Sequence, residues 1–193
     1  YSVANWHETV HRTAFKSRRL NEIFYHISSF MCDFEGFRWR WSHTFHHSCT
    51  LQTKNDYDHE IQVSRPTDLI AFFLNYIPFT DLLFPHRLIK YEVIKHAFGF
   101  FTPVVDISAP ANEKKKILWN SRLYVFIWVV IIALSLYYKT ILPILYIILP
   151  TYYGKPLWFL VNVTQHLGAA LDTTDHREST YSLKINPLFS FLY

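Results

Sequence analysis

Two long apolar runs with a short polar interruption constrain the fold of this chain more than any other feature. The first run, residues 123–138, carries no formal charge, and residues 117–120 extend it to about the ~20 residues that a helix needs to cross a bilayer. Arg122 lies near its start, where a long basic side chain can reach the membrane surface. The second run covers residues 141–163 and contains three prolines and one lysine. These runs predict a transmembrane helical hairpin at about residues 117–163.

Two buried helices in a soluble α protein are the alternative, but runs of Ile, Leu, Tyr and Trp this long exceed those of ordinary core helices. A third apolar segment, residues 69–84, is short for a span and is broken by Pro78, which favours an interfacial or re-entrant helix. Fifteen of the nineteen Lys and Arg residues precede residue 123, and Lys139 lies at the tip of the hairpin. The positive-inside rule therefore predicts that the segments flanking the hairpin face the cytoplasm.

Composition and charge exclude several classes of protein. Half of the residues are hydrophobic, 19% are aromatic and only four of 193 are glycine, which is not the composition of a disordered chain. The formal charge is +4, but the basic residues are scattered and form a run only at residues 114–116. We therefore interpret the charge as a membrane-surface bias and expect no nucleic-acid partner. Cys32 and Cys49 are too few for a disulfide framework. The length suits one domain, residues 1–193.

Three segments carry polar side chains of metal-ligand type at helical spacing. Residues three or four apart project from one face of a helix, and imidazole is the commonest metal ligand. Five or six imidazoles exceed the four ligands of one tetrahedral zinc. The surplus suggests two metal ions, with iron favoured over zinc or manganese because such a site suits oxygen activation. The candidate ligands are His7 and His11 in HETVH, His43, His46 and His47 in HTFHH, and Asn162 and His166 in NVTQH.

The same residues admit other interpretations. HETVH also matches the zincin pattern, in which two histidines bind zinc and the glutamate, here Glu8, acts as general base, although this leaves HTFHH without a role. His176 lies near Asp172 and Asp175, which either orient a ligating ring or share a solvated loop with it. The remaining histidines lack a partner at such a spacing and are interpreted as surface or core residues; they are His26, His59, His86 and His96.

The order of these motifs resembles that of the integral-membrane fatty acid desaturases and the related membrane alkane and carotenoid hydroxylases. HETVH, then HTFHH, then a hydrophobic hairpin leading into NVTQH follow that family over essentially the whole chain. The resemblance implies an all-α fold, a multi-span membrane helical bundle with a cytosolic histidine-rich helical cap, and two irons bound by the candidate ligands. A third histidine box, expected after His166, is absent. We therefore expect a fragment that continues beyond Tyr193 and follows further spans upstream of Tyr1.

The resemblance also implies an enzyme, an oxygen-dependent fatty acyl desaturase of lipid metabolism. Two irons and O2 would remove two hydrogens from neighbouring methylenes of an acyl chain and leave a cis double bond, while a hydroxylase would use the same centre. The substrate would be an acyl lipid, an acyl-CoA or an acyl carrier. No catalytic residue is expected apart from the metal ligands. Side chains beside the ligands should orient them, and the candidates are Glu8, Asp175 and His176.

Electrons must come from a partner, because the chain has no haem or flavin motif and two cysteines cannot hold a four-cysteine iron–sulfur cluster. The resemblance implies a donor such as cytochrome b5 or ferredoxin. A membrane zinc protease and a non-catalytic relative of the desaturases are the alternatives from other classes. Four basic residues could receive an acidic donor or contact phospholipid; they are Arg12, Lys16, Arg18 and Arg19.

Overall fold

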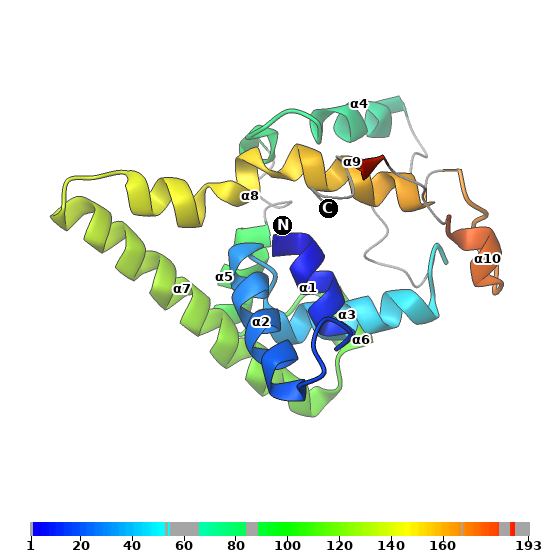
Figure 1. The fold of residues 1–193 in the computed structure, drawn as a ribbon, viewed down its shortest axis with the longest axis horizontal. Helices are drawn as coiled ribbons and strands as arrows, with labels where there is room; N and C mark the ends of the chain where they lie inside the picture. The colour runs from blue at the N-terminus through cyan, green and yellow to red at the C-terminus, as the bar shows by residue number, and fades with distance from the viewer. Residues whose placement is uncertain are drawn as a thin grey trace.

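The computed structural model describes residues 2–52, 54, 66–83, 89–166, 168–181 and 186–187 (Figure 1). Every regular element in these ranges is a helix, which confirms the all-α prediction. The α-helices are α1 (Ser2–Val10), α2 (Arg18–Met31), α3 (Gly36–Ser48), α4 (Pro66–Leu74), α5 (Ile89–Ala97), α6 (Pro103–Ser108), α7 (Lys114–Tyr137), α8 (Pro150–Tyr153), α9 (Lys155–His166) and α10 (His176–Ser179). The 3-10 turns η1 (Thr80–Leu83) and η3 (Ala111–Glu113) and the π-helix η4 (Ile144–Ile148) complete them.

The first three helices form the part of the fold that carries most of the histidines. α2 begins where Ser17 Oγ accepts a hydrogen bond from the amide of Leu20. α3 begins where the Glu35 carboxylate accepts hydrogen bonds from the amides of Phe37 and Arg38, at 3.2 and 2.7 Å. Such caps satisfy amides that have no partner inside the helix. The hydrophobic core of this region consists of Trp6, Tyr25, Cys32 and Phe34.

The longest helix, α7, combines a buried stripe with a large exposed apolar surface. Apolar side chains outside the stripe, such as Phe126 and Leu136, are 65% and 73% exposed. Ala111–Tyr137 is, among the described residues, the one helix long and apolar enough to cross a membrane. The buried residues recur every three or four positions, as on the inward face of a helix; they are Ile117, Ser121, Tyr124, Trp128, Ile131 and Ser135.

After α7 the chain reverses direction and continues as a row of short helices, η4, α8 and α9, which we call the limb (Figure 1). η4 follows Pro143, α8 begins at Pro150, and Pro156 lies in the first turn of α9. Proline lacks the amide hydrogen that a continuous helix requires, so these positions divide the limb into short helices. The described residues thus contain one candidate span, and the membrane hairpin and the multi-span bundle stay predictions.

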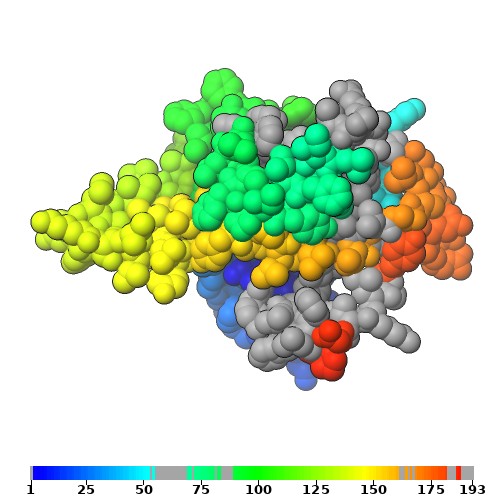
Figure 2. All heavy atoms as spheres, turned by 90° about the horizontal axis from the view of Figure 1, so that it is seen from above, coloured from blue at the N-terminus to red at the C-terminus, as the bar shows by residue number. Residues whose placement is uncertain are grey.

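α4 covers the outer side of α9. The rings of Phe72 and Tyr76 lie 5.5 and 5.1 Å from the ring of Phe159, which is 2% exposed. Figure 2 shows α4 and the turn that follows it spread along α9. The helix ends at Leu74, before Pro78, so the third apolar segment forms a short helix and a turn.

A buried ion pair between Lys90 and Asp33 connects the limb to the rest of the molecule. Lys90 Nζ on α5 donates hydrogen bonds to the carboxylate of Asp33, to the carbonyl of Ile148 at 3.0 Å and to Oγ1 of Thr151 at 2.9 Å. Asp33 lies in the turn between α2 and α3, whereas Ile148 ends η4. One ammonium group therefore connects the turn before α3 to the break in the limb that leads into α9.

Candidate metal centre

Four histidines from α1 and α3 form a compact cluster. His7 lies on α1 and His11 directly follows its last residue, Val10, whereas His43 and His47 lie one turn apart on α3. Their ligand nitrogens all lie within 4.8 Å of one another. His43 is central, because its Nε2 lies 3.0 Å from Nε2 of His11 and 3.1 Å from Nε2 of His47.

The cluster fits a nitrogen-ligated transition metal. Two imidazole nitrogens bound to one ion at about 2.0–2.1 Å lie at most about 4.2 Å apart, so the spread of these four nitrogens is close to what one ion bridges. The single Nε2 of His43 carries either a hydrogen or a lone pair, whereas a cation would satisfy all the converging lone pairs at once. The donor set contains nitrogen and no thiolate, which suits iron, zinc or copper better than magnesium or calcium.

Three of the four imidazoles, those of His11, His43 and His47, have a pKa lowered by their environment, which favours the neutral form that metals bind. Burial lowers the pKa of His43 to about 2 and that of His47 to about 4, and the neighbouring histidines lower both further. Burial and His7 also hold the pKa of His11 below its ordinary value. The ring of Trp6 covers one side of the cluster, 5.0 Å from the ring of His43. Neutral imidazoles keep their lone pairs at pH 7, so metal binding would not have to displace protons.

His46 and His166 form a second group beside the cluster. The two rings lie 5.5 Å apart, and the ring of His46 lies 6.2 Å from that of His43. His166 Nδ1 lies 3.0 Å from the carbonyl oxygen of Ser179. Because a carbonyl only accepts, this contact places the hydrogen on Nδ1 and leaves the lone pair on Nε2, the arrangement typical of a metal-binding histidine. The fold thus brings a histidine that follows the long apolar region against the triplet that precedes it.

The fatty acid desaturase family model matches residues 2–193. The chain belongs to the fatty acid desaturase family. Membership makes desaturase- or hydroxylase-type oxidoreductase chemistry in lipid metabolism the functional class, and this family is generally membrane-bound and dependent on two irons. No curated protein and no solved structure matches the chain.

The other predicted site residues of this family member are placed less centrally. Glu8 Oε1 lies 3.4 Å from His7 Nδ1, and its Oε2 accepts a hydrogen bond from Thr13, so it adjoins a candidate ligand. Asp175 caps α10 and binds the Arg177 guanidinium, while His176 is exposed; no described contact joins either to the histidine groups. Asn162 lies on α9 one turn before His166, with its side chain outside the described residues.

The remaining histidines include one core residue. His96 is fully buried, and His26 is partly buried against the ring of Phe37 at 5.4 Å. His59 and His86 lie outside the described residues.

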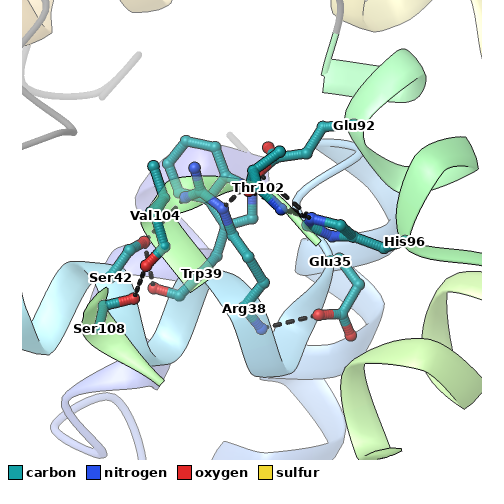
Figure 3. Close-up of polar contacts among 9 residues, drawn as sticks. All are labelled: Glu35, Arg38, Trp39, Ser42, Glu92, His96, Thr102, Val104 and Ser108. Atoms are coloured by element: carbon teal, nitrogen blue, oxygen red, sulfur yellow. Dashed lines mark hydrogen bonds and ion pairs between the residues drawn. The ribbon is translucent and has the colours of Figure 1, made fainter. Parts of the chain in front are cut away.

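A buried polar network that the sequence did not predict holds α3 against α5 and the segment that leads into α6 (Figure 3). Arg38 Nε lies 3.0 Å from Glu92 Oε1, and Arg38 Nη1 donates to Ser42 Oγ at 2.8 Å. Thr102 Oγ1 donates to the same Glu92 oxygen at 2.9 Å, and the Thr102 amide donates to His96 Nε2 at 3.3 Å. Burial alone would raise the pKa of Glu92, but the Arg38 charge holds it below its usual value. Arg38 and Ser42 lie one turn apart on the helix that carries the triplet, so the network fixes the rotation of α3.

A second carboxylate links the two histidine-bearing helices. Glu22 on α2 pairs with Arg12 Nε at 3.1 Å and with Arg40 Nη2 at 2.9 Å. Arg12 follows His11 directly, and Arg40 lies on α3, one turn before the triplet. Glu22 therefore bridges the end of α1 to α3.

Replacing Glu22 with Gln is expected to weaken metal binding by up to about fivefold, because a partly exposed ion pair contributes roughly 0.2–1 kcal/mol. A competitive titration of the purified protein with Co²⁺ would measure the affinity. Glu113→Gln is the matched control, since it removes a carboxylate that pairs with Lys116 at the start of α7. Equal affinities of the two variants and the unmodified protein would contradict the link between Glu22 and the cluster.

Proposed function

We propose that this chain is part of an oxygen-dependent fatty acyl desaturase that binds two iron ions. The supporting observation is the convergence of His7, His11, His43 and His47 on one point, with His46 and His166 beside it, in a chain that belongs to the fatty acid desaturase family. The cluster would hold one ion. His46 and His166 would contribute to the second, together with Asn162.

Bound iron would supply the oxidising power to remove hydrogen from an unactivated methylene, with O2 as the oxidant. Forming one cis double bond removes two hydrogens from the acyl chain, and two further electrons and two protons complete the reduction of O2 to two waters. The electrons require a donor such as cytochrome b5 or ferredoxin. The substrate is an acyl lipid, an acyl-CoA or an acyl carrier, and α7 would keep the site close to such substrates at a bilayer.

The protein's own residues neutralise, shield and orient the ligands. Burial keeps the imidazoles of His43 and His47 uncharged, and Trp6 excludes water from one side of the cluster. Glu8 adjoins His7, and the carbonyl of Ser179 fixes the ring of His166. In this proposal the ligands are carried by α1, α3 and α9 and by the residue that follows α1, and the histidine side faces the cytoplasm in a multi-pass protein.

The zinc protease is less well supported. Catalytic zinc sites use three protein ligands and keep one open position for water. Here two imidazoles from α3 lie beside His7 and His11. The four imidazoles would occupy all the positions of a tetrahedral zinc and leave none for water. Hydroxylation uses the same centre, so product analysis must separate it from desaturation.

The assignment is tested by supplying the full-length protein in membranes with an electron donor, O2 and acyl lipids, and by analysing the products with mass spectrometry. A product lighter than the substrate by two hydrogens supports desaturation, whereas one heavier by an oxygen supports the hydroxylase. No oxidised product from iron-loaded protein would favour the non-catalytic relative.

Replacing His46 or His166 with Ala is expected to remove the same one of two bound irons, because the two rings lie side by side and away from the centre of the four-histidine cluster. Iron per protein, measured by elemental analysis, should fall by about half in each variant and no further in the double variant, as for residues that share one site. Additive losses in the double variant would contradict a shared ion.

A further inference from the structure

Helix α2 has the reverse of the amphipathic pattern of a soluble surface helix. Its inward face contains Asn21, Tyr25, Ser28 and Ser29, which are all buried. Its outward face is a continuous apolar stripe with the helical spacing i, i+3, i+4 and i+7. The stripe consists of Leu20, Ile23, Phe24 and Ile27, with exposed fractions of 43%, 54%, 42% and 55%. Exposing four large apolar side chains to water in one row is unfavourable, so the stripe indicates an apolar environment.

The start of α2 is strongly basic where helix electrostatics disfavours cations. Lys16, Arg18 and Arg19 are exposed, and none makes an ion pair within the described residues. The N-terminal end of a helix carries partial positive charge, and the first turn of α2 contains no acidic residue. An external anion would relieve this repulsion. Arg12 differs from these three residues, because it pairs with Glu22.

Basic residues at one end and an apolar stripe along one face match an anionic bilayer surface. Helices of this kind lie in the interface, with the stripe among the acyl chains and the basic groups at the lipid phosphates. The ring of Phe15 stacks on that of Phe24 at 4.9 Å and adds to the apolar face. The other end of α2 meets the candidate span, since the rings of Phe30 and Tyr124 lie 5.0 Å apart.

We infer that α2 lies in the surface of an anionic bilayer, with Leu20, Ile23, Phe24 and Ile27 among the lipid chains and Lys16, Arg18 and Arg19 at the phosphates. The same basic residues are thereby assigned to lipid rather than to an electron donor. The inference goes beyond the proposed reaction and requires no bound metal. It also explains why the buried face of α2 is polar, since that face meets α1 and the start of α3 instead of lipid.

This placement sets the distance between lipid and the metal centre. Tyr25 on the buried face of α2 lies 6.4 Å from Trp6, ring to ring, and Trp6 lies 5.0 Å from His43. Two aromatic contacts therefore separate the lipid-facing helix from the centre of the cluster.

The inference is tested by the accessibility of a fluorophore on α2. The complete protein carries Cys49→Ser, keeps the buried Cys32, and receives Ile27→Cys labelled with an environment-sensitive dye. It is placed in vesicles of phosphatidylglycerol and phosphatidylcholine, and quenching by spin-labelled lipid is compared with quenching by aqueous iodide. Ile23→Cys is a second labelled position. Arg177→Cys, at a side chain that is 89% exposed on α10, is the control.

Spin-labelled lipid should quench the labels at Ile27 and Ile23 at least about twofold more than the label at Arg177, and iodide should show the opposite order. Adding Arg18→Glu and Arg19→Glu should reduce lipid quenching in vesicles with phosphatidylglycerol and leave it nearly unchanged in pure phosphatidylcholine. Strong iodide quenching at Ile27 would overturn the inference by placing the stripe in water. Protection from both quenchers would overturn it by showing that protein covers the stripe. Because the readout is independent of turnover, its failure would leave the proposed desaturase activity untouched.

Discussion

Replacing His43 with Ala is expected to empty the four-histidine cluster and to lower acyl turnover by more than about 100-fold, since residues that merely orient metal ligands already contribute about 10–100-fold. His43 is the residue whose Nε2 lies within 3.1 Å of two other ring nitrogens, so its removal leaves the remaining three imidazoles without their common neighbour. Iron content and product formation would be measured on the same purified sample.

Thr44→Ala is the matched control for this prediction. Thr44 lies next to His43 on α3, is exposed, and donates its hydroxyl to the Arg40 carbonyl at 2.8 Å. This variant should keep both its iron and its turnover. Normal iron content and turnover in His43→Ala would show that the cluster is not a metal site. Loss of iron in both variants would point instead to damage of α3.

Replacing Glu92 with Ala is expected to lower the free energy of unfolding by about 3–5 kcal/mol, because it takes the Glu92 carboxylate away from the buried Arg38 guanidinium. The Arg38 side chain is 6% exposed and that of Glu92 is 18% exposed, so water compensates little. For a chain of this size the loss corresponds to a fall in melting temperature of about 6–20 °C. Thermal unfolding in detergent, followed by circular dichroism, would measure it.

The pair Arg38→Met and Glu92→Met separates the ion pair from simple loss of packing. The double variant should be more stable than either single variant, because it removes both buried charges of the pair together. Asp106→Ala is the surface control, since its partner Lys114 lies at 2.6 Å but is 33% exposed. That variant should lose less than about 1 kcal/mol. A Glu92→Ala variant as stable as the control would contradict the role of the buried network.

The local pattern of the sequence was sufficient to find the histidine groups. The sequence predicts helical spacing for His7 and His11 and for the triplet, and the structure places His7 on α1, His11 directly after it, and the triplet on α3. The apolar run before Lys139 similarly becomes α7. Such features depend on residues a few positions apart, which is why periodicity predicts them.

Features that depend on distant residues could not be predicted in this way. Arg38 lies on α3 and Glu92 on α5, and the sequence pattern of neither helix indicates that these two residues pair. The pattern of α2 shows two faces, but only the packing against α1 reveals that its polar face points inward. The apolar run after Lys139 was predicted as one limb of a hairpin, yet its prolines divide it into η4, α8 and α9.

The helix break in the limb and the Lys90 contacts around it together determine how freely α9 can move. Without a tether, the helix break at Pro150 would let α9 turn and move His166 away from His46. Lys90 provides a tether, because it contacts Ile148 and Thr151 on the two sides of the break and also Asp33. Asp33 lies two residues before Glu35, whose carboxylate caps α3. Lys90 therefore connects the start of α3 to the helix break that precedes α9. Turning α9 about the break would require these Lys90 contacts to open, so the anchor favours the position of His166 beside His46.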